Sequence, residues 1–344
     1  MKVSICFPQY NRIEYLLHSL SIIENQLYQN IEICISDDAS TDDTENKISE
    51  LINHYNFPII YERFGKNQGY DRNYRRCIEI SSGDYAFVLG NDDSLNGNDA
   101  ISKLVDFLNL NPNADIGFCN MVEEISGNTL IERAKFSKVI GSGPEIALNN
   151  YSSFSFVGGL IYKRNTFLEY NTDKYDKSIY TQMYLAVLMI ASGCKLFSIK
   201  EPLVIKDIVL DEIERGSYRD RLIRNWKDFK AVDGGLPSVI NVLINALHDS
   251  NSLTQKRIYK IFSRIYFVTY TFWLFDYRKN KAFVNAVGLS FGLLPFKNSN
   301  FQKLHLINKI KNLFIYCFST SIGLLFPVYF FEKMKSKLYK FFKN

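Results

Sequence analysis

The first 120 residues alternate short, β-branched runs with segments in which apolar residues recur at helical spacing, and this alternation constrains the fold more than any other feature. Alternating strands and helices are typical of a mostly parallel sheet covered by helices. The predicted strands are residues 2–7, 31–36, 59–63, 85–89, 116–121 and 156–162. The predicted helices are residues 16–27, 40–55, 71–80, 98–110 and 179–192, and the polar stretch 123–150 is predicted to be irregular. We therefore predict an α/β fold with helices on both faces of a central sheet.

The composition of the chain changes near the turn-forming residues 233–252. A length of 344 residues suits about two domains, which we place at 1–235 and 236–344, the second being helical, basic and aromatic. Hydrophobic residues make up 47% and charged residues 22%, a balance that excludes a disordered chain. The six cysteines form no CxxC pair and have no zinc-like spacing, and the amino-terminal apolar run is too short for a signal peptide. We infer a reducing, cytoplasmic location.

The carboxyl-terminal region places positive charge beside a long uncharged run. The net charge is +5, yet residues 297–344 contain nine Lys and a single acid, Glu332. Residues 313–331 are nineteen residues without a charge, which reaches the length of a membrane span. Because this run contains Gly323 and Pro327, and because the lysines after it alternate with aromatic residues, we favour monotopic attachment to a membrane surface over a span.

Two alternatives to this membrane interpretation were weighed. A hydrophobic helix packed on the first domain would have the same composition. A nucleic-acid-binding tail is disfavoured, because lysines alternating with large apolar side chains do not form an Arg-rich groove. We therefore expect a membrane surface and no nucleic acid as the partner.

Acidic pairs follow two of the predicted strands directly. Asp37 and Asp38 come after the second strand, and Asn91, Asp92 and Asp93 come after the fourth. In open α/β sheets ligands bind beyond the carboxyl ends of the strands, so the two loops should share a crevice. Neither GxGxxG nor GxxxxGK[ST] follows the first strand, which disfavours a dinucleotide site and a P-loop, and HExxH does not occur, which disfavours the metalloproteases that carry it.

Four motifs in register resemble the nucleotide-sugar domain of glycosyltransferase family 2, which has the GT-A fold. These motifs are PQYN at 8–11, SDDASTDDT at 36–44, NQGYDRN at 67–73 and GNDD at 90–93. Each is weak alone, but their order and spacing match over about the first 120 residues. Within the family they look most like bacterial O-antigen transferases, including those that add dideoxyhexoses such as abequose. The resemblance implies a nucleotide-sugar half at 1–120, an acceptor half at 121–235 and a membrane-associating region at 236–344.

The resemblance also implies a metal ion at the fourth strand. Cleavage of a nucleoside diphosphate sugar leaves growing negative charge on the diphosphate, and Mg²⁺ or Mn²⁺ held by one or two carboxylates neutralises it. The family's usual DxD motif would be Asn91-Asp92-Asp93, with Asp93 ligating the metal and Asp92 contacting the metal shell or the ribose. The alternative is a surface turn that caps the helix near Asn98.

The remaining motifs imply contacts to the nucleotide. Asp38 would accept hydrogen bonds from a pyrimidine base while Asp37 braces the loop, although both could merely serve the helix start at Ser40. The other residues implied in nucleotide-sugar binding are Pro8, Tyr10, Asn11, Asn67, Gly69, Arg72, Asn73, Asn91 and Asp92. Tyr10 could equally be a packing aromatic, and Arg72, Arg75 and Arg76 could form a solvated helix face.

The catalytic base is the point at which the sequence departs from the family. An inverting displacement needs a carboxylate that takes the proton from the acceptor hydroxyl. The family's positions for it correspond to Thr181 and Gln182, neither of which is a base at neutral pH. Asp173 and Asp176 are the nearest upstream carboxylates, each of which could also be a loop acid, and we name Asp176 as the candidate. Inversion and retention both stay open.

Together these residues favour a metal-dependent glycosyltransferase. The expected partners are a nucleotide-sugar donor and a lipid-linked (polyprenyl diphosphate) glycan acceptor, at the cytoplasmic face of the bacterial inner membrane, in O-antigen or other surface-polysaccharide synthesis. The second hypothesis is a non-catalytic scaffold that binds nucleotide-sugar or glycan, motivated by the missing base. The sequence does not select the donor sugar or its nucleotide.

Overall fold

The computed structural model describes residues 1–210 and 236–343. The chain divides into two compact units, of which unit 1 is Met1–Glu212 with Asp249–Ser252 and unit 2 is Ile213–His248 with Leu253–Asn344. The domain boundary that the sequence predicts at residue 235 lies outside the described residues. The two units are treated separately below.

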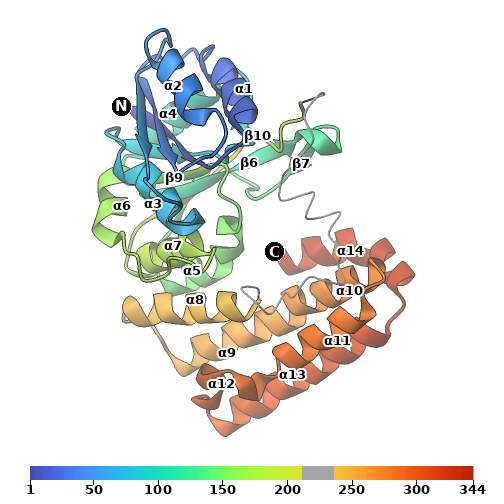
Figure 1. Ribbon diagram of the computed structural model, residues 1–344. Coiled ribbons are helices and arrows are strands. Elements are labelled where there is room, and N and C mark those ends of the chain that lie inside the picture. Colours follow the sequence, from blue (N-terminus) through green and yellow to red (C-terminus); the bar gives the residue numbers. More distant parts are fainter. Residues whose placement is uncertain (211–235, 344) are drawn as a thin grey trace. The chain divides into compact units, whose positions relative to one another are not determined.

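Unit 1 is built on a ten-stranded sheet in the order β3-β2-β1-β4-β9-β6-β10-β5, with β7 paired to β6 and β8 to β10 (Figure 1). Strands β3, β2, β1 and β4 are parallel to one another, and β6 is parallel to β10. The bounds are β1 (Val3–Gln9), β2 (Ile31–Asp37), β3 (Ile59–Arg63), β4 (Tyr85–Val88), β5 (Ser94–Leu95), β6 (Ile116–Glu123), β7 (Thr129–Ile131), β8 (Lys138–Gly141), β9 (Leu160–Lys163) and β10 (Leu196–Lys206).

The sheet is mixed rather than mostly parallel, which corrects the sequence prediction. Strand β9 lies between β4 and β6 and runs antiparallel to both. The prediction missed this because a buried strand has the same apolar pattern in either direction. Strands β7 and β8 were also missed inside the stretch predicted to be irregular, since each is short and pairs with a single neighbour.

Helices pack on both faces of this sheet (Figure 1). They are α1 (Ile13–Ile23), α2 (Thr44–Ile52), α3 (Tyr70–Glu79), α4 (Ala100–Leu110), α5 (Pro144–Asn150), α6 (Arg164–Tyr170) and α7 (Thr181–Ala191). Leu16, Leu20 and Ile23 of α1 are buried against the sheet, as their spacing predicts. Leu27, predicted to continue that face, lies beyond the helix and is 63% exposed. Every residue of α7 is buried, as the sequence predicts for that helix.

Unit 2 is helical. The structure describes α8 (Leu236–Asp249), α9 (Gln255–Arg264), a π-helical segment at Ile265–Tyr270, α10 (Thr271–Lys279), α11 (Phe283–Gly292), α12 (Ser299–Gln302), α13 (Leu306–Leu325) and α14 (Val328–Lys343). The uncharged run 313–331 is divided between α13 and α14 on either side of Pro327. Within the described ranges no single helix meets the length and hydropathy of a membrane span; α13 and Val328–Lys335 meet them only together, with a bend of 109° between them.

Candidate functional site

Loops that follow β1, β2 and β4 meet beside the first turn of α3. The backbone N–H of Asn11 donates to Ser40 Oγ at 2.8 Å, and the N–H of Thr41 donates to Asn11 Oδ1 at 2.8 Å. On the other side, Asn91 Nδ2 donates to the carbonyl of Tyr10 at 3.3 Å. The structure thus brings three of the four sequence motifs together through the loop at 10–12, at the carboxyl ends of the parallel strands where ligands bind in such sheets.

The loop after β1 has an unusual backbone conformation. Asn11 and Arg12 have φ of 53° and 60°, in the left-handed region that non-glycine residues rarely adopt. Arg12 NH1 also donates to Asp92 Oδ2 at 2.9 Å, which ties this loop to the one after β4. Residues held in sparsely populated backbone regions cluster at functional sites, where surrounding contacts enforce them.

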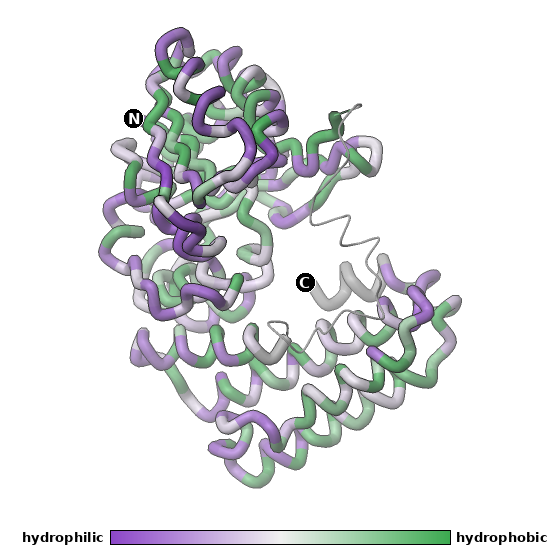
Figure 2. The backbone as a smooth tube through the Cα atoms, in the orientation of Figure 1, coloured by the Kyte–Doolittle hydropathy of each residue, from purple (hydrophilic) through white to green (hydrophobic). Residues whose placement is uncertain are grey.

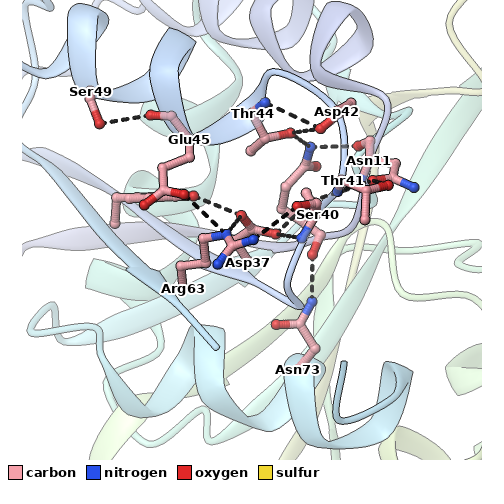
Figure 3. Close-up of polar contacts among 12 residues, drawn as sticks. Asn11, Asp37, Ser40, Thr41, Asp42, Thr44, Glu45, Ser49, Arg63 and Asn73 are labelled. Atoms are coloured by element: carbon pink, nitrogen blue, oxygen red, sulfur yellow. Dashed lines mark hydrogen bonds and ion pairs between the residues drawn. The ribbon is translucent and has the colours of Figure 1, made fainter. Parts of the chain in front are cut away.

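Asp37 holds the loop after β2 (Figure 3). Its fully buried carboxylate accepts hydrogen bonds from the Ser40 N–H at 2.9 Å, from Ser40 Oγ at 2.5 Å and from the Tyr61 hydroxyl at 2.7 Å. Arg63 Nε lies 3.5 Å from the same carboxylate. These contacts give Asp37 the loop-bracing position that the sequence interpretation assigned to it.

Asp38 joins the loop after β2 to the start of α3. Its carboxylate accepts the backbone N–H groups of Gln68 at 2.6 Å and Gly69 at 2.9 Å. Asn67 Oδ1 accepts the same Gly69 N–H at 3.0 Å, and Gly69 has a φ of 90°, which favours glycine there. Burial raises the pKa of Asp38, and the two backbone hydrogen bonds offset part of that effect. Each oxygen keeps a second lone pair, with which it could accept from a ligand.

The arginines of α3 converge on one acid. Arg72, Arg75 and Arg76 all form ion pairs with Glu79 near the end of the helix. Arg75 is buried, so it does not belong to a solvated face, whereas Arg72 also lies over the ring of Phe64 at 5.6 Å. Any contact of Arg72 with a nucleotide would thus require it to leave Glu79.

Asn73, beside Arg72 in the same motif, points into the site from α3 (Figure 3). Its Nδ2 donates to the carbonyl of Gln9 at 2.8 Å. Its Oδ1 is buried and has no hydrogen-bond partner among the described residues. An unsatisfied buried acceptor of this kind is costly unless something supplies the donor, so Asn73 is a candidate ligand contact.

The first turn of α7 contains two further unsatisfied groups. Gln182 is buried, and neither its Oε1 nor the Thr181 hydroxyl has a partner in the described part of the chain. Asp71 of α3, which the sequence interpretation missed although it lies inside the NQGYDRN motif, accepts from the N–H groups of Ile179 at 2.8 Å and Thr181 at 3.2 Å. Burial raises the pKa of Asp71, partly offset by these two bonds.

Asp176, the candidate base, lies outside this turn and forms an ion pair with Arg75. Arg75 donates from Nε to Oδ1 at 3.0 Å and from NH2 to Oδ2 at 2.7 Å. Bidentate pairs of this kind are strong and orient both side chains. The geometry therefore gives Asp176 a structural contact between α3 and the loop before α7.

Asp93 points into the protein at the end of β4. Its side chain is buried, its Oδ1 accepts the N–H of Asp207 at 3.2 Å, and its Oδ2 accepts the N–H of Gly90 at 3.2 Å. Burial, followed by the charge of Asp92, raises the pKa of Asp93 to about 7. The surroundings therefore favour the protonated form of this carboxyl group.

Gly90 of the GNDD motif and Gly158, which the sequence interpretation did not single out as a site residue, both approach Asp93 closely. A β-carbon at Gly90 would come within 2.8 Å of Asp93 Oδ2, and one at Gly158 would collide with it. Arg133 fixes the Gly158 segment by donating to the carbonyls of Gly158 at 2.7 Å and Cys119 at 2.8 Å. The pair Gly158-Gly159 immediately before β9 was the available signal, since glycines at a strand end often mark close approach.

The carboxylates at this site suit a metal that takes most of its ligands from elsewhere. Within residues 1–210 and 236–343 no three His, Cys, Asp or Glu side chains converge to hold an ion by themselves. Asp92 and Asp93 supply at most two carboxylates, which is the usual protein share for Mg²⁺ bound with substrate phosphates and water. The carboxyl of Asp93, whose pKa is raised by burial and by the charge of Asp92, fits that chemistry.

Comparisons with known proteins show which family the chain resembles. The family model described as Glycosyl transferase family 2 matches residues 4–188. Abequosyltransferase RfbV of Salmonella typhimurium is 36% identical over 246 residues, which are 65% of this chain and 72% of that protein. The GalNAc(5)-diNAcBac-PP-undecaprenol beta-1,3-glucosyltransferase of Campylobacter jejuni is 29% identical over 143 residues, 40% of this chain and 46% of that protein.

Solved structures share the fold. TarS 1–349 of S. aureus in complex with UDP-GlcNAc has a TM-score of 0.60 at 13% identity, over 94% of this chain and 91% of that one. The mannosyltransferase PcManGT of Pyrobaculum calidifontis, in complex with GDP-Man and Mn²⁺, has a TM-score of 0.51 at 14% identity, over 94% and 87%. With more than half of the residues matched by the family model and a relative aligned over most of its length, the chain belongs to glycosyltransferase family 2 and is a glycosyltransferase.

Proposed function

We propose that this glycosyltransferase moves a sugar from a nucleoside diphosphate to a lipid-linked, polyprenyl diphosphate glycan during the synthesis of O-antigen or another bacterial surface polysaccharide. The proposal rests on one observation: in a chain of this family, the loop at 10–12 contacts both the loop at 37–41 and the loop at 90–93, which contains Asp93. The similarity to an abequosyltransferase supports a dideoxyhexose as the donor sugar. The similarity to a transferase named for an undecaprenol-linked substrate supports a lipid-linked acceptor.

Donor binding would use the loops around Asp38. Asp38 would accept from the base through the lone pairs that Gln68 and Gly69 leave free. Pro8, Tyr10 and Asn11 would form the wall of the base pocket. Asn67, Gly69, Arg72, Asn73 and Asn91 would complete the nucleotide-sugar site.

Asp93, with Asp92 beside it, would hold Mg²⁺ or Mn²⁺. When bound, the cation neutralises charge on the departing diphosphate. Asp93 must lose its proton to take part, which its raised pKa allows near neutral pH. Asp92 would exchange its contact with Arg12 for one with the cation.

The acceptor hydroxyl would lie near the first turn of α7. Gln182 Oε1 has no hydrogen-bond partner among the residues that the structure describes, and it would position the hydroxyl by receiving its hydrogen bond. Asp176 stays the proposed proton acceptor, which requires it to exchange at least one hydrogen bond with Arg75 during the reaction. A non-catalytic scaffold is the second candidate, favoured by this engagement of Asp176.

Attachment to the cytoplasmic face of the inner membrane, peripheral or monotopic, forms part of the same proposal. A lipid-linked acceptor is confined to the bilayer, and an enzyme held at that surface meets it at high effective concentration. The nine lysines of residues 297–344 are attracted to the anionic lipids of a cytoplasmic leaflet.

The test begins with the full chain and a panel of UDP-, CDP-, dTDP- and GDP-sugars. One donor should raise the melting temperature only when Mg²⁺ or Mn²⁺ is present, and that donor should then glycosylate a lipid-linked acceptor. Asp93→Asn should abolish the metal-dependent shift, whereas Asp99→Asn, an exposed acid paired with Lys103, should not. Stabilisation without transfer across a wide acceptor panel would favour the scaffold, and no stabilisation by any donor would refute both.

A further inference from the structure

Helix α13 has its polar side inside and its apolar side outside. The residues that it buries within unit 2 are Asn312, Tyr316, Ser319 and Gly323. The side chains that it exposes include Ile310, Phe314 at 71% and Leu325 at 77%. A helix on the surface of a soluble protein normally shows the reverse arrangement. Small and polar residues facing other helices, with large apolar residues facing outward, are typical of helices that contact lipid.

The inward face of α13 is fixed by specific contacts, so the helix cannot rotate to bury its apolar side. Ser263 Oγ donates to Asn312 Oδ1 at 2.7 Å, and the Tyr316 hydroxyl donates to the carbonyl of Ser290 at 2.6 Å. A β-carbon at Gly323 would collide with Leu274 of α10, which shows how closely these helices approach. The exposed apolar face is therefore a stable feature of unit 2.

Helix α11 contacts α13 and lies beside it (Figures 1 and 2). Its ten residues include no charged side chain, and it exposes Val284 at 81% and Phe291 at 62%. We call the outward sides of α11 and α13 together the α11–α13 face. An exposed apolar surface that covers two helices exceeds the isolated apolar side chains found on most soluble proteins and marks an interaction site.

The charges near this face are positive. Residues 251–344 contain sixteen Lys and Arg and only two acids, Asp276 and Glu332. Both acids pair with lysines elsewhere, Asp276 with Lys335 at 3.1 Å and Glu332 with Lys279 at 2.9 Å. The lysines around the face, which are exposed and have no carboxylate partner in the part of unit 2 that the structure describes, are Lys297, Lys303 and Lys311.

We propose that the α11–α13 face docks on an anionic lipid bilayer, with its apolar side chains in the boundary between headgroups and acyl chains and its lysines at the lipid phosphates. A second copy of the chain is the less suitable occupant, because pairing two such faces would bring their lysines together. The proposal extends the proposed function by naming the surface that meets the acceptor's bilayer, but its test does not depend on sugar transfer.

The experiment measures sedimentation of the full chain with vesicles of phosphatidylcholine, with and without about 30% phosphatidylglycerol. Phe314→Asp and Ile310→Asp place a charge on the face at exposed positions where folding should tolerate it. Each is expected to lower the partition coefficient by about tenfold. Lys303→Gln with Lys311→Gln should remove most of the gain from phosphatidylglycerol. Leu110→Asp, which adds the same charge to an exposed apolar residue of unit 1, should change neither.

Unchanged vesicle binding in Phe314→Asp and Ile310→Asp would overturn the proposal. A dimer seen by light scattering that Phe314→Asp dissociates, in a chain that does not bind vesicles, would assign the face to self-association and would also overturn it. Vesicle binding without transfer from any donor would contradict only the proposed function. Donor-dependent transfer to a detergent-solubilised acceptor without vesicle binding would contradict only the docking proposal.

Discussion

Replacing Asp93 by Asn should make the metal-free protein more stable at neutral and alkaline pH, while removing the proposed metal ligand. The buried carboxyl of Asp93 has a pKa of about 7, against 3.8 for a free aspartate. The fold therefore favours the protonated form of Asp93, and its contribution to stability is fully present below about pH 4 and is lost as pH rises to about 7. Asn keeps the shape of the protonated acid and never ionises.

The size of the effect follows from the shift. At 1.36 kcal/mol per unit, the difference between 3.8 and about 7 corresponds to about 4 kcal/mol above pH 8. Urea unfolding in EDTA, followed by circular dichroism, should show the stability of Asp93→Asn relative to the parent chain rising by an amount of this order between pH 4 and pH 8. At either pH the variant also loses about 1–2 kcal/mol, because one of the two backbone N–H groups that Asp93 accepts then faces an amide N–H, so it should be slightly less stable than the parent chain at pH 4 and more stable at pH 8. Saturating Mn²⁺ with donor should reverse the order, because only the parent gains the ligand.

The control is Asp99→Asn, whose exposed carboxylate pairs with Lys103 and should change stability little at either pH. If Asp93→Asn were as stable as the parent chain at pH 8, or less stable, the carboxyl of Asp93 would not be destabilised by its surroundings. The proposal that Asp93 is a buried carboxylate destabilised until it binds a cation would then be refuted.

Three further changes probe the sheet and the site. Glu32→Gln should lower the free energy of unfolding by about 3 kcal/mol at pH 7. Burial alone would raise the pKa of Glu32, but hydrogen bonds from Lys2, Ser4 and Ser82 lower it to about 2. In urea titrations the difference between variant and parent should therefore shrink as the pH falls from about 4.5 to 2. Gly158→Ala should weaken metal-dependent donor binding in calorimetry because its methyl group collides with Asp93, whereas Gly65→Ala, which meets nothing within 4 Å, should bind normally. Asp38→Asn leaves one of two backbone N–H groups facing an amide N–H, so we expect a stability loss of about 1–2 kcal/mol together with weaker nucleotide binding; tight binding by this variant would exclude Asp38 as a base contact.

Local sequence pattern was sufficient to predict most of the helices and strands of residues 1–110. Strands β1 to β4 and helices α1 to α4 fall close to the predicted ranges because each has a strong hydrophobic period and clear turn residues at its ends. The bracing role of Asp37 could also be predicted, since Ser40 is only three residues away and local side-chain to backbone contacts depend on short spacing.

Contacts between distant segments could not be predicted in the same way. Gly158 meets Asp93, and Arg133 reaches the carbonyl of Gly158, only because β9 inserts between β4 and β6, which no local pattern specifies. The arginines of α3 were expected to face either the nucleotide or solvent, but Arg75 meets Asp176, 101 residues along the chain. Sequence spacing does not record partners at that separation.

The carboxylate of Asp71 links the two parts of unit 1 that we propose bind the substrates. It belongs to the helix that starts at the donor loop, yet it holds the backbone that leads into the first turn of α7. These two hydrogen bonds tie α3, beside the proposed donor site, to the first turn of α7, beside the proposed acceptor site. A hinge between the two sites would have to break both bonds, so we expect the distance between donor and acceptor to change little when either substrate binds.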